Sequence, residues 1–176
     1  MKQTIISRFL AIALMMTTGN LAANAGWTDN LSPYDLNAPL GWATVDGNVT
    51  GGEGGTKVTV TNKTELMNAL KGTDKKIIYV DGEIEFSGLT NVNSVQNKTI
   101  IGMKGAAFVN SKHSASVSET GIMQLSSCKN IILRNIIFKS AGAYDIDGND
   151  NLTIIGSTYI WVDHCDFQDG VDGNFD

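Results

Sequence analysis

Carboxylate side chains gather near the end of this sequence, where they could bind a metal ion. They occur in three places: Asp145, Asp147 and Asp150 in one loop, Asp163, Asp166 and Asp169 in and after an apolar run, and Asp172 and Asp176 beyond it. Calcium takes six to eight hard oxygen ligands in irregular geometry, so carboxylates from neighbouring strand ends are enough to form a site. The alternative interpretation is that these acidic loops are solvated and bind nothing.

The first 25 residues carry the pattern of a secretory signal peptide. Lys2 and Arg8 give a positive start, Phe9–Met16 is a short apolar core, and Ala23–Ala25 is a small-residue cleavage site. We therefore expect a secreted protein, extracellular or periplasmic, that begins at Gly26. We expect no membrane association after cleavage, because no later apolar stretch is long enough to span a bilayer.

The charge balance limits the partners of this chain. The formal net charge is −5, and removal of the signal segment makes it more negative, which disfavours nucleic acid as a partner. An acidic substrate would need bound cations or local Lys and Arg side chains. Cys128 and Cys165 could pair in an oxidising compartment or remain free thiols, and the sequence leaves both possibilities open.

The mature chain divides into an irregular arm and a longer strand-rich region. Residues 26–49 are rich in aromatic and turn residues and lack periodicity. The glycine cluster Thr50–Thr56 predicts a tight turn before a strand at Lys57–Thr61. One short helix follows, with a capping residue among Thr61, Asn62 and Thr64 and a stop at Gly72.

The rest of the chain repeats one short pattern of strand and turn. Apolar runs 32 and then 29 residues apart begin at Lys98, Asn130 and Tyr159. Strands at this spacing without intervening helices favour a solenoid whose coils each contain several parallel strands. Asparagines at the strand ends, such as Asn130 and Asn135, could hydrogen-bond from coil to coil and tolerate left-handed geometry. An antiparallel sandwich is the alternative fold.

Several motifs, taken in order, resemble pectate lyases of polysaccharide lyase family 1. The strand Trp161–His164, preceded by Asp150 and followed by Asp172–Asp176, is similar to the calcium-site region of that family. The upstream motifs that resemble the family are Gly51–Gly55, Glu65–Leu70, Tyr79–Gly82, Lys98–Gly102 and Asn130–Asn135. The resemblance implies an all-β right-handed parallel β-helix over residues 50–176, incomplete at its C-terminal end, with one short N-terminal helix.

The resemblance also implies a calcium site made of Asp150, Asp172 and Asp176. Some family members have a further acid at the position of Gly148, and Asp147 could replace it here. The implied reaction is calcium-dependent β-elimination on polygalacturonate, in which calcium binds the uronate carboxylate and stabilises the developing charge. We expect the pectate polymer as substrate and a monomeric protein.

The resemblance assigns no catalytic residue to this sequence. Asp163 and His164 suggest an acid–base pair, but in the family they belong to the strand motif, so we expect a structural pair; Arg134 is also expected to be structural. The family's catalytic arginine lies in an Arg-x-Pro-x-Arg segment, and no arginine follows Arg134 here. We therefore expect the N-terminal part of a longer lyase that is inactive by itself. A non-catalytic solenoid that binds polysaccharide, and a calcium-independent pectin lyase, are the alternatives.

Overall fold

The computed structural model describes residue 39, residues 41–47 and residues 49–176. The predicted signal peptide and most of the predicted arm lie outside the described residues, so the division of the chain at residues 25 and 49 stays a prediction. Within the described part, no helix combines the length and the apolar character that a membrane crossing requires.

The described strands form three sheets, and every strand pair in them is parallel. The five-stranded sheet contains β1 (Thr56–Val60), β2 (Lys76–Val80), β5 (Gln96–Gly102), β8 (Lys129–Arg134) and β11 (Thr158–Asp163). The three-stranded sheet contains β4 (Thr90–Asn93), β7 (Met123–Ser126) and β10 (Leu152–Ile155). The four-stranded sheet contains β3 (Glu83–Glu85), β6 (Ala107–Val109), β9 (Ile137–Lys139) and β12 (Asp166–Gln168).

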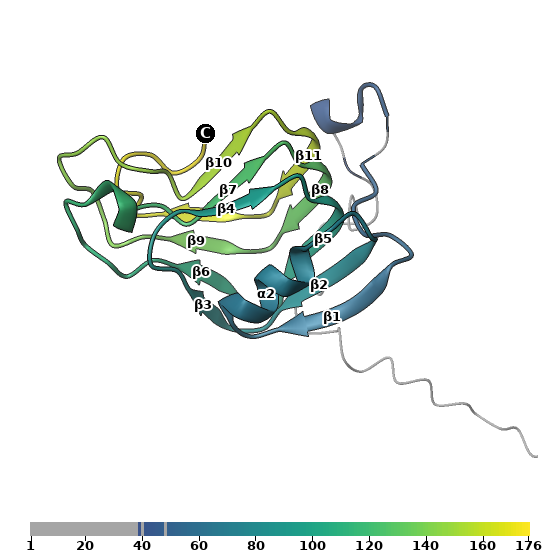
Figure 1. The fold of residues 1–176 in the computed structure, drawn as a ribbon, viewed down its shortest axis with the longest axis horizontal. Coiled ribbons are helices and arrows are strands. Elements are labelled where there is room, and N and C mark those ends of the chain that lie inside the picture. Colours follow the sequence, from purple (N-terminus) through teal and green to yellow (C-terminus); the bar gives the residue numbers. More distant parts are fainter. Residues whose placement is uncertain (1–38, 40, 48) are drawn as a thin grey trace, which may run out of the picture. The chain divides into compact units, whose positions relative to one another are not determined.

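The chain visits the three sheets in turn, which makes the fold a parallel β-helix (Figure 1). One coil consists of β7, β8 and β9, and the next consists of β10, β11 and β12, each strand paired with its counterpart in the previous coil. The predicted β-helix is confirmed. The alternative, an antiparallel sandwich, is excluded for the described residues because all their strand pairs are parallel.

The spacing between coils differs by one residue from the predicted spacing at one step. Asn130 stacks on Asn97, which is 33 residues earlier, and Cys128 stacks on Ser157, which is 29 residues later. The predicted spacing of 32 residues was wrong because it aligned Asn130 with Lys98. The matching corner residue is Asn97, the residue before it.

The corners of the coils depend on residues in the left-handed backbone region. Asn97, Asn130 and Asn135 have φ values of 55°, 58° and 55°. Asparagine tolerates this conformation better than most residues with a side chain. The Asn130 amide also donates to Oδ1 of Asn97 at 2.8 Å and accepts from the backbone N–H groups of Thr50 and Gly51, both at 2.8 Å. The predicted asparagine contacts between coils are therefore present.

A column of phenylalanines runs through the interior from coil to coil. The ring centroids of Phe86, Phe108, Phe138, Phe167 and Phe175 are 5.3, 5.4, 4.9 and 5.1 Å apart in that order. Phe86, Phe108 and Phe138 are fully buried, whereas Phe175 is 48% exposed. Each coil thus contributes one ring to a continuous core.

The short helix α2 (Lys63–Leu70) covers part of this core. Its N-cap is Asn62, which accepts a hydrogen bond from the backbone of Glu65, and Glu65 in turn accepts one from the backbone of Thr61. This reciprocal arrangement stabilises the first turn of the helix. Leu66 and Leu70 are buried and belong to the core cluster. The helix was predicted from the sequence, and Asn62 is one of the three residues predicted as candidates for its cap.

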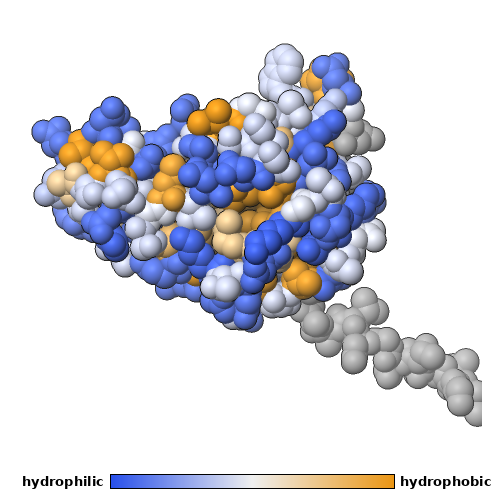
Figure 2. Space-filling model, in the orientation of Figure 1, coloured by the Kyte–Doolittle hydropathy of each residue, from blue (hydrophilic) through white to orange (hydrophobic). Residues whose placement is uncertain are grey.

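On the face shown in Figure 2, hydrophilic surface predominates and hydrophobic colour is confined to separate patches.

Cys128 is buried, Cys165 is partly buried, and both are free thiols. Cys128 stacks on Ser157 and Cys165 lies next to β12, so the two cysteines occupy different corners of the coils.

Candidate calcium site

Asp150 lies two residues before the start of β10, at the end of the loop that follows β9. The chain after β12 returns beside β10: the backbone N–H of Leu152 donates to Asn174 at 3.1 Å, and that of Asp176 donates to Leu152 at 3.0 Å. A parallel bridge joins Leu152 and Phe175. This pairing brings the segment that contains Asp172 and Asp176 alongside Asp150.

Gly173 packs directly against the Asp150 carboxylate. Its backbone N–H donates a hydrogen bond to that carboxylate, and a Cβ atom at Gly173 would lie 2.4 Å from Oδ1 of Asp150. Real Cβ contacts are never this short, so a side chain at this position would displace the carboxylate. The glycine therefore leaves room for Asp150 and orients it.

The three carboxylates form one electrostatic group. Burial raises the pKa of Asp150 above its ordinary value, and the negative charges of Asp172 and Asp176 raise it further. The Gly173 hydrogen bond acts in the opposite direction. Both charge effects on Asp150 come from other acids, so a bound cation would relieve the repulsion within this group.

The side chains of Asp150, Asp172 and Asp176 are not arranged as a preformed set of metal ligands. In residues 39, 41–47 and 49–176, no three His, Cys, Asp or Glu side chains are arranged as a group that could hold a metal ion. Asp172 and Asp176 are exposed, so their side chains can rotate toward Asp150 without disturbing the core. A donor set of carboxylate oxygens alone fits a hard cation such as calcium better than zinc or copper.

Asn151, which the sequence identifies only as one of several strand-end asparagines, connects the parts of this site. It is fully buried, and its amide donates to the backbone of Gln168 at 2.8 Å and to Oδ1 of Asn174 at 2.9 Å. Its oxygen accepts a hydrogen bond from Ser140. Asn151 thus fixes Asp150, its neighbour, relative to the segment that follows β12. A strand-end asparagine was the available signal, but other strand ends have one too.

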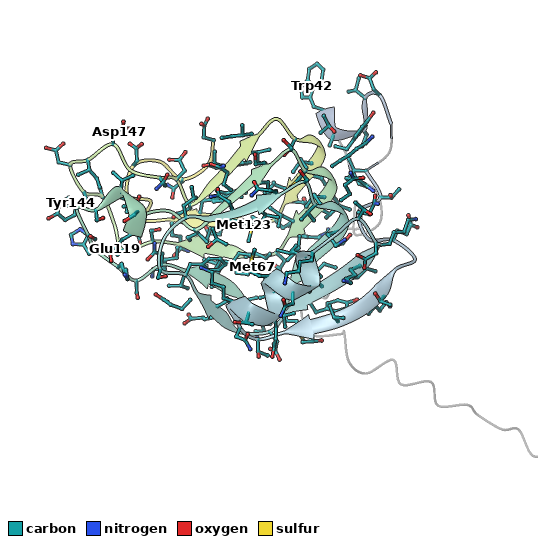
Figure 3. All side chains as sticks on the ribbon, viewed as in Figure 1. Trp42, Met67, Glu119, Met123, Tyr144 and Asp147 are labelled. Atoms are coloured by element: carbon teal, nitrogen blue, oxygen red, sulfur yellow. The ribbon has the colours of Figure 1, made fainter. Side chains whose placement is uncertain are left out.

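The remaining acids of the predicted region lie outside this group. Figure 3 shows Asp147 at the outer rim of the loop between β9 and β10, and its side chain is exposed. Asp145 is also exposed, and Asp166 accepts a hydrogen bond from Gln168. A Cβ atom at Gly148 would lie 3.6 Å from Cβ of Asp172, so the position of Gly148, and not the side chain of Asp147, borders the site.

Asp163, His164 and Arg134 form a contact network on the five-stranded sheet. Oδ2 of Asp163 is 3.1 Å from Nε of Arg134, and its Oδ1 is 2.8 Å from Nδ1 of His164. The Arg134 guanidinium lies 5.4 Å from the ring centroid of Trp161. Arg134 and Asp163 are direct neighbours across β8 and β11, and this geometry supports the predicted structural role.

His113 has a partner that the sequence did not reveal. Its ring packs against Tyr144 with a centroid distance of 4.9 Å, and Nε2 is 3.3 Å from the backbone oxygen of Ala143. The contact joins the loop after β6 to the loop after β9. Tyr144 is 40% exposed and lies on the same outer loop as Asp147 in Figure 3.

The fold and the acidic group together define a class: a parallel β-helix protein with a candidate metal site at the edge of its three-stranded sheet. Residues 11–175 match the sequence model of the family described as pectate lyase. The chain belongs to the pectate lyase family.

Curated relatives carry names from the same group of enzymes. The chain is 33% identical over 139 residues to pectate lyase plyB of Emericella nidulans, a match that covers 78% of this chain and 38% of the relative. It is 35% identical over 120 residues to a pectin lyase of Pectobacterium carotovorum, covering 66% of this chain and 35% of the relative. The chain therefore spans well under half the length of these relatives.

Solved structures show the same fold. A polygalacturonate lyase fused with a self-assembling amphipathic peptide matches with a TM-score of 0.58 at 24% identity, covering 76% of this chain and 50% of that chain. A pectate lyase bound to a hexasaccharide matches with a TM-score of 0.54 at 24% identity, covering 73% of this chain and 47% of that chain. These matches identify the fold as the right-handed parallel β-helix.

Proposed function

We propose that this chain carries the calcium-binding part of a secreted pectate lyase that cleaves polygalacturonate by β-elimination. The observation that carries the proposal is the return of the chain beside β10, which brings the segment with Asp172 and Asp176 alongside Asp150. Membership of the pectate lyase family supports the reaction class. The overall acidity of the chain also fits, because a metal ion would allow an acidic protein to bind an acidic polymer.

The residues of the site have distinct roles in this proposal. Asp150, Asp172 and Asp176 bind the cation, the N–H of Gly173 orients Asp150, and Asn151 holds the two loops in register. When bound, calcium supplies positive charge that neutralises a uronate carboxylate and makes the proton at C5 of that sugar more acidic. The three aspartates thereby orient the substrate carboxylate beside β10.

Removal of the C5 proton is not assigned to any residue of this chain. In the resembling family the base is an arginine of an Arg-x-Pro-x-Arg segment, and the 176-residue sequence has no such segment. We therefore propose that the polypeptide of these residues binds calcium and pectate but does not cleave pectate by itself. We further propose that it is exported with cleavage before Gly26 and that it is a monomer.

Calcium titration calorimetry of the purified protein tests the metal site. We expect one calcium ion to bind, and Asp150→Asn or Asp176→Asn to weaken binding at least about tenfold, because each removes one charged ligand. Asp145→Asn is the matched control, since it removes an exposed acid from the same loop as Asp150. Equal calcium affinity in all four proteins would refute the site.

An assay of unsaturated uronide ends on polygalacturonate tests the activity. We expect no cleavage by the 176-residue protein with calcium present, and robust cleavage would contradict that part of the proposal.

A pectin lyase is the second candidate, favoured by the match to the Pectobacterium enzyme. It would bind methyl-esterified pectin equally well with and without calcium, whereas we expect demethylated pectate to bind only with calcium. A non-catalytic solenoid would bind polysaccharide equally well after alanine substitution of Asp150 and Asp176.

A further inference from the structure

A pocket of about 310 Å³ lies at the corner where the chain passes from the three-stranded sheet into the five-stranded sheet. It is lined by Gly47, Gln96, Asn97, Lys129, Asn130 and Tyr159. Its volume lies within the range of small-ligand sites in proteins. Gln96 and Lys129 begin β5 and β8, whereas Asp150 precedes β10. The pocket and the candidate calcium site therefore lie at opposite ends of the strands of the three-stranded sheet.

The two asparagines of the pocket are committed to the fold. Asn97 donates to the backbone of Thr73 at 2.8 Å, and Asn130 donates to Asn97 and Thr50 and accepts from two backbone N–H groups. They form a fixed wall.

Three other lining groups remain able to bind a ligand. Within residues 39, 41–47 and 49–176, the Gln96 amide and the Lys129 ammonium group make no hydrogen bond. Lys129 Nζ lies 5.7 Å from the ring centroid of Tyr159. The Tyr159 hydroxyl makes one long contact of 3.4 Å to the backbone oxygen of Asp46.

Tyr159 occupies a position that the fold would fill better with asparagine. It follows Asn97 and Asn130 in the stack of corner residues, and its φ of 57° matches their values of 55° and 58°. An aromatic residue in the left-handed region is strained, whereas asparagine tolerates it and would extend the amide contacts by one coil. The chain thus keeps a strained tyrosine whose ring lines a pocket beside a lysine.

The chemistry of the pocket selects an anionic, partly apolar ligand. Lys129 is the one charged side chain among the six lining residues, so the pocket attracts a negative group. The Tyr159 ring, which is partly buried and lines the pocket, offers a flat apolar surface, and Gln96 offers both a donor and an acceptor. A uronic acid combines these features, because it has a carboxylate, an apolar ring face and hydroxyl groups.

We propose that this pocket is a second saccharide site that binds one uronate unit without calcium. Lys129 pairs with the carboxylate, the Tyr159 ring stacks on the apolar face of the sugar, and the Gln96 amide binds a hydroxyl. The ligand class rests on the proposed function of the chain, but the binding does not depend on the three aspartates. The site would hold an acidic polymer on the protein at a distance from the candidate calcium site.

Titration of the whole protein with galacturonate, trigalacturonate and neutral galactose, in EDTA and followed by amide NMR, tests the proposal. We expect galacturonate and trigalacturonate, but not galactose, to shift the signals of Gln96, Lys129 and Tyr159. Lys129→Ala should weaken binding about tenfold or more, since it removes a charge-assisted hydrogen bond. Lys104→Ala, an exposed lysine outside the pocket, should leave binding unchanged.

Tyr159→Asn separates binding from folding. We expect it to abolish uronate binding while the melting temperature stays equal or rises, because the substitution relieves the strained backbone. Retained binding in this variant, equal binding of galactose, or the same loss in Lys104→Ala would overturn the proposal. Asp150→Asn should leave this binding intact while it weakens calcium binding. A failure of the pocket is thus distinguishable from a failure of the proposed calcium site.

Discussion

Gly173→Ala isolates the orientation of Asp150 from the charge of the calcium site. The added Cβ would lie 2.4 Å from Oδ1, 3.1 Å from Cγ and 3.4 Å from Oδ2 of Asp150. The carboxylate must therefore move and lose its hydrogen bond from the Gly173 backbone. Gly173 does not have a positive φ, so alanine causes no backbone strain and the effect is confined to the carboxylate.

The expected loss follows from that hydrogen bond. A hydrogen bond to a charged group contributes about 1.5–3 kcal/mol. If Asp150 must be held in place to bind calcium, its loss weakens calcium binding by roughly 10- to 100-fold. Calcium titration calorimetry measures this change, and thermal unfolding in EDTA should show a much smaller effect.

Gly148→Ala is the matched control for this experiment. Gly148 also lacks a positive φ, and a Cβ there would meet Thr120 and Val171 side-chain atoms at 3.3 Å without reaching the Asp150 carboxylate. We expect its calcium affinity to stay within about twofold of the unsubstituted protein. Equal affinity of Gly173→Ala and Gly148→Ala would refute the conclusion that Gly173 orients a calcium ligand.

Three further predictions concern the site, a buried thiol and the coil corners. Gly148→Asp should tighten calcium binding, measured by the same titration, because its Cβ would lie 3.6 Å from Cβ of Asp172 and a fourth carboxylate would join the group; unchanged or weaker binding would contradict this. Burial raises the pKa of Cys165 to about 11, so between about pH 9 and pH 11 the unfolded chain releases a proton that the folded chain keeps. Stability should therefore fall as pH rises through that window, by up to about 3 kcal/mol, and Cys165→Ala should reduce that fall in urea unfolding. Asn130→Ala should lower the free energy of unfolding, measured in urea, by about 2–4 kcal/mol. The substitution removes the hydrogen bonds to Asn97 and to the backbone of Thr50 and Gly51, and it places alanine in the left-handed region. A loss below about 0.5 kcal/mol would contradict this.

The fold could be predicted because strand ends and apolar runs repeat visibly along the chain. The first spacing was predicted one residue short, since apolar content alone cannot distinguish Asn97 from Lys98 as the corner position. The three-residue strands β6, β9 and β12 were not predicted, because segments this short have no periodicity of their own. Their pairing comes from the neighbouring coils.

Less of the candidate site than of the fold could be predicted from the sequence. Spacing alone left eight aspartates as candidates, and the resemblance to a family selected three of them. The contact of Gly173 with Asp150 and the contacts of Asn151 depend on two loops from different coils, which no local pattern reveals. Tyr159 was seen only as a strand former, because its left-handed backbone follows from the stack beneath it.

The column of phenylalanine rings bears on the order in which the coils can fold. Each coil contacts only its neighbours, so the free energy of the array is a sum of coil terms and interface terms. The helix α2 packs on β1 and β2 and buries Leu66 and Leu70 at the first of the described coils. A nascent chain can therefore fold in the order of its synthesis, because each new phenylalanine ring packs on the ring of the coil that was made before it.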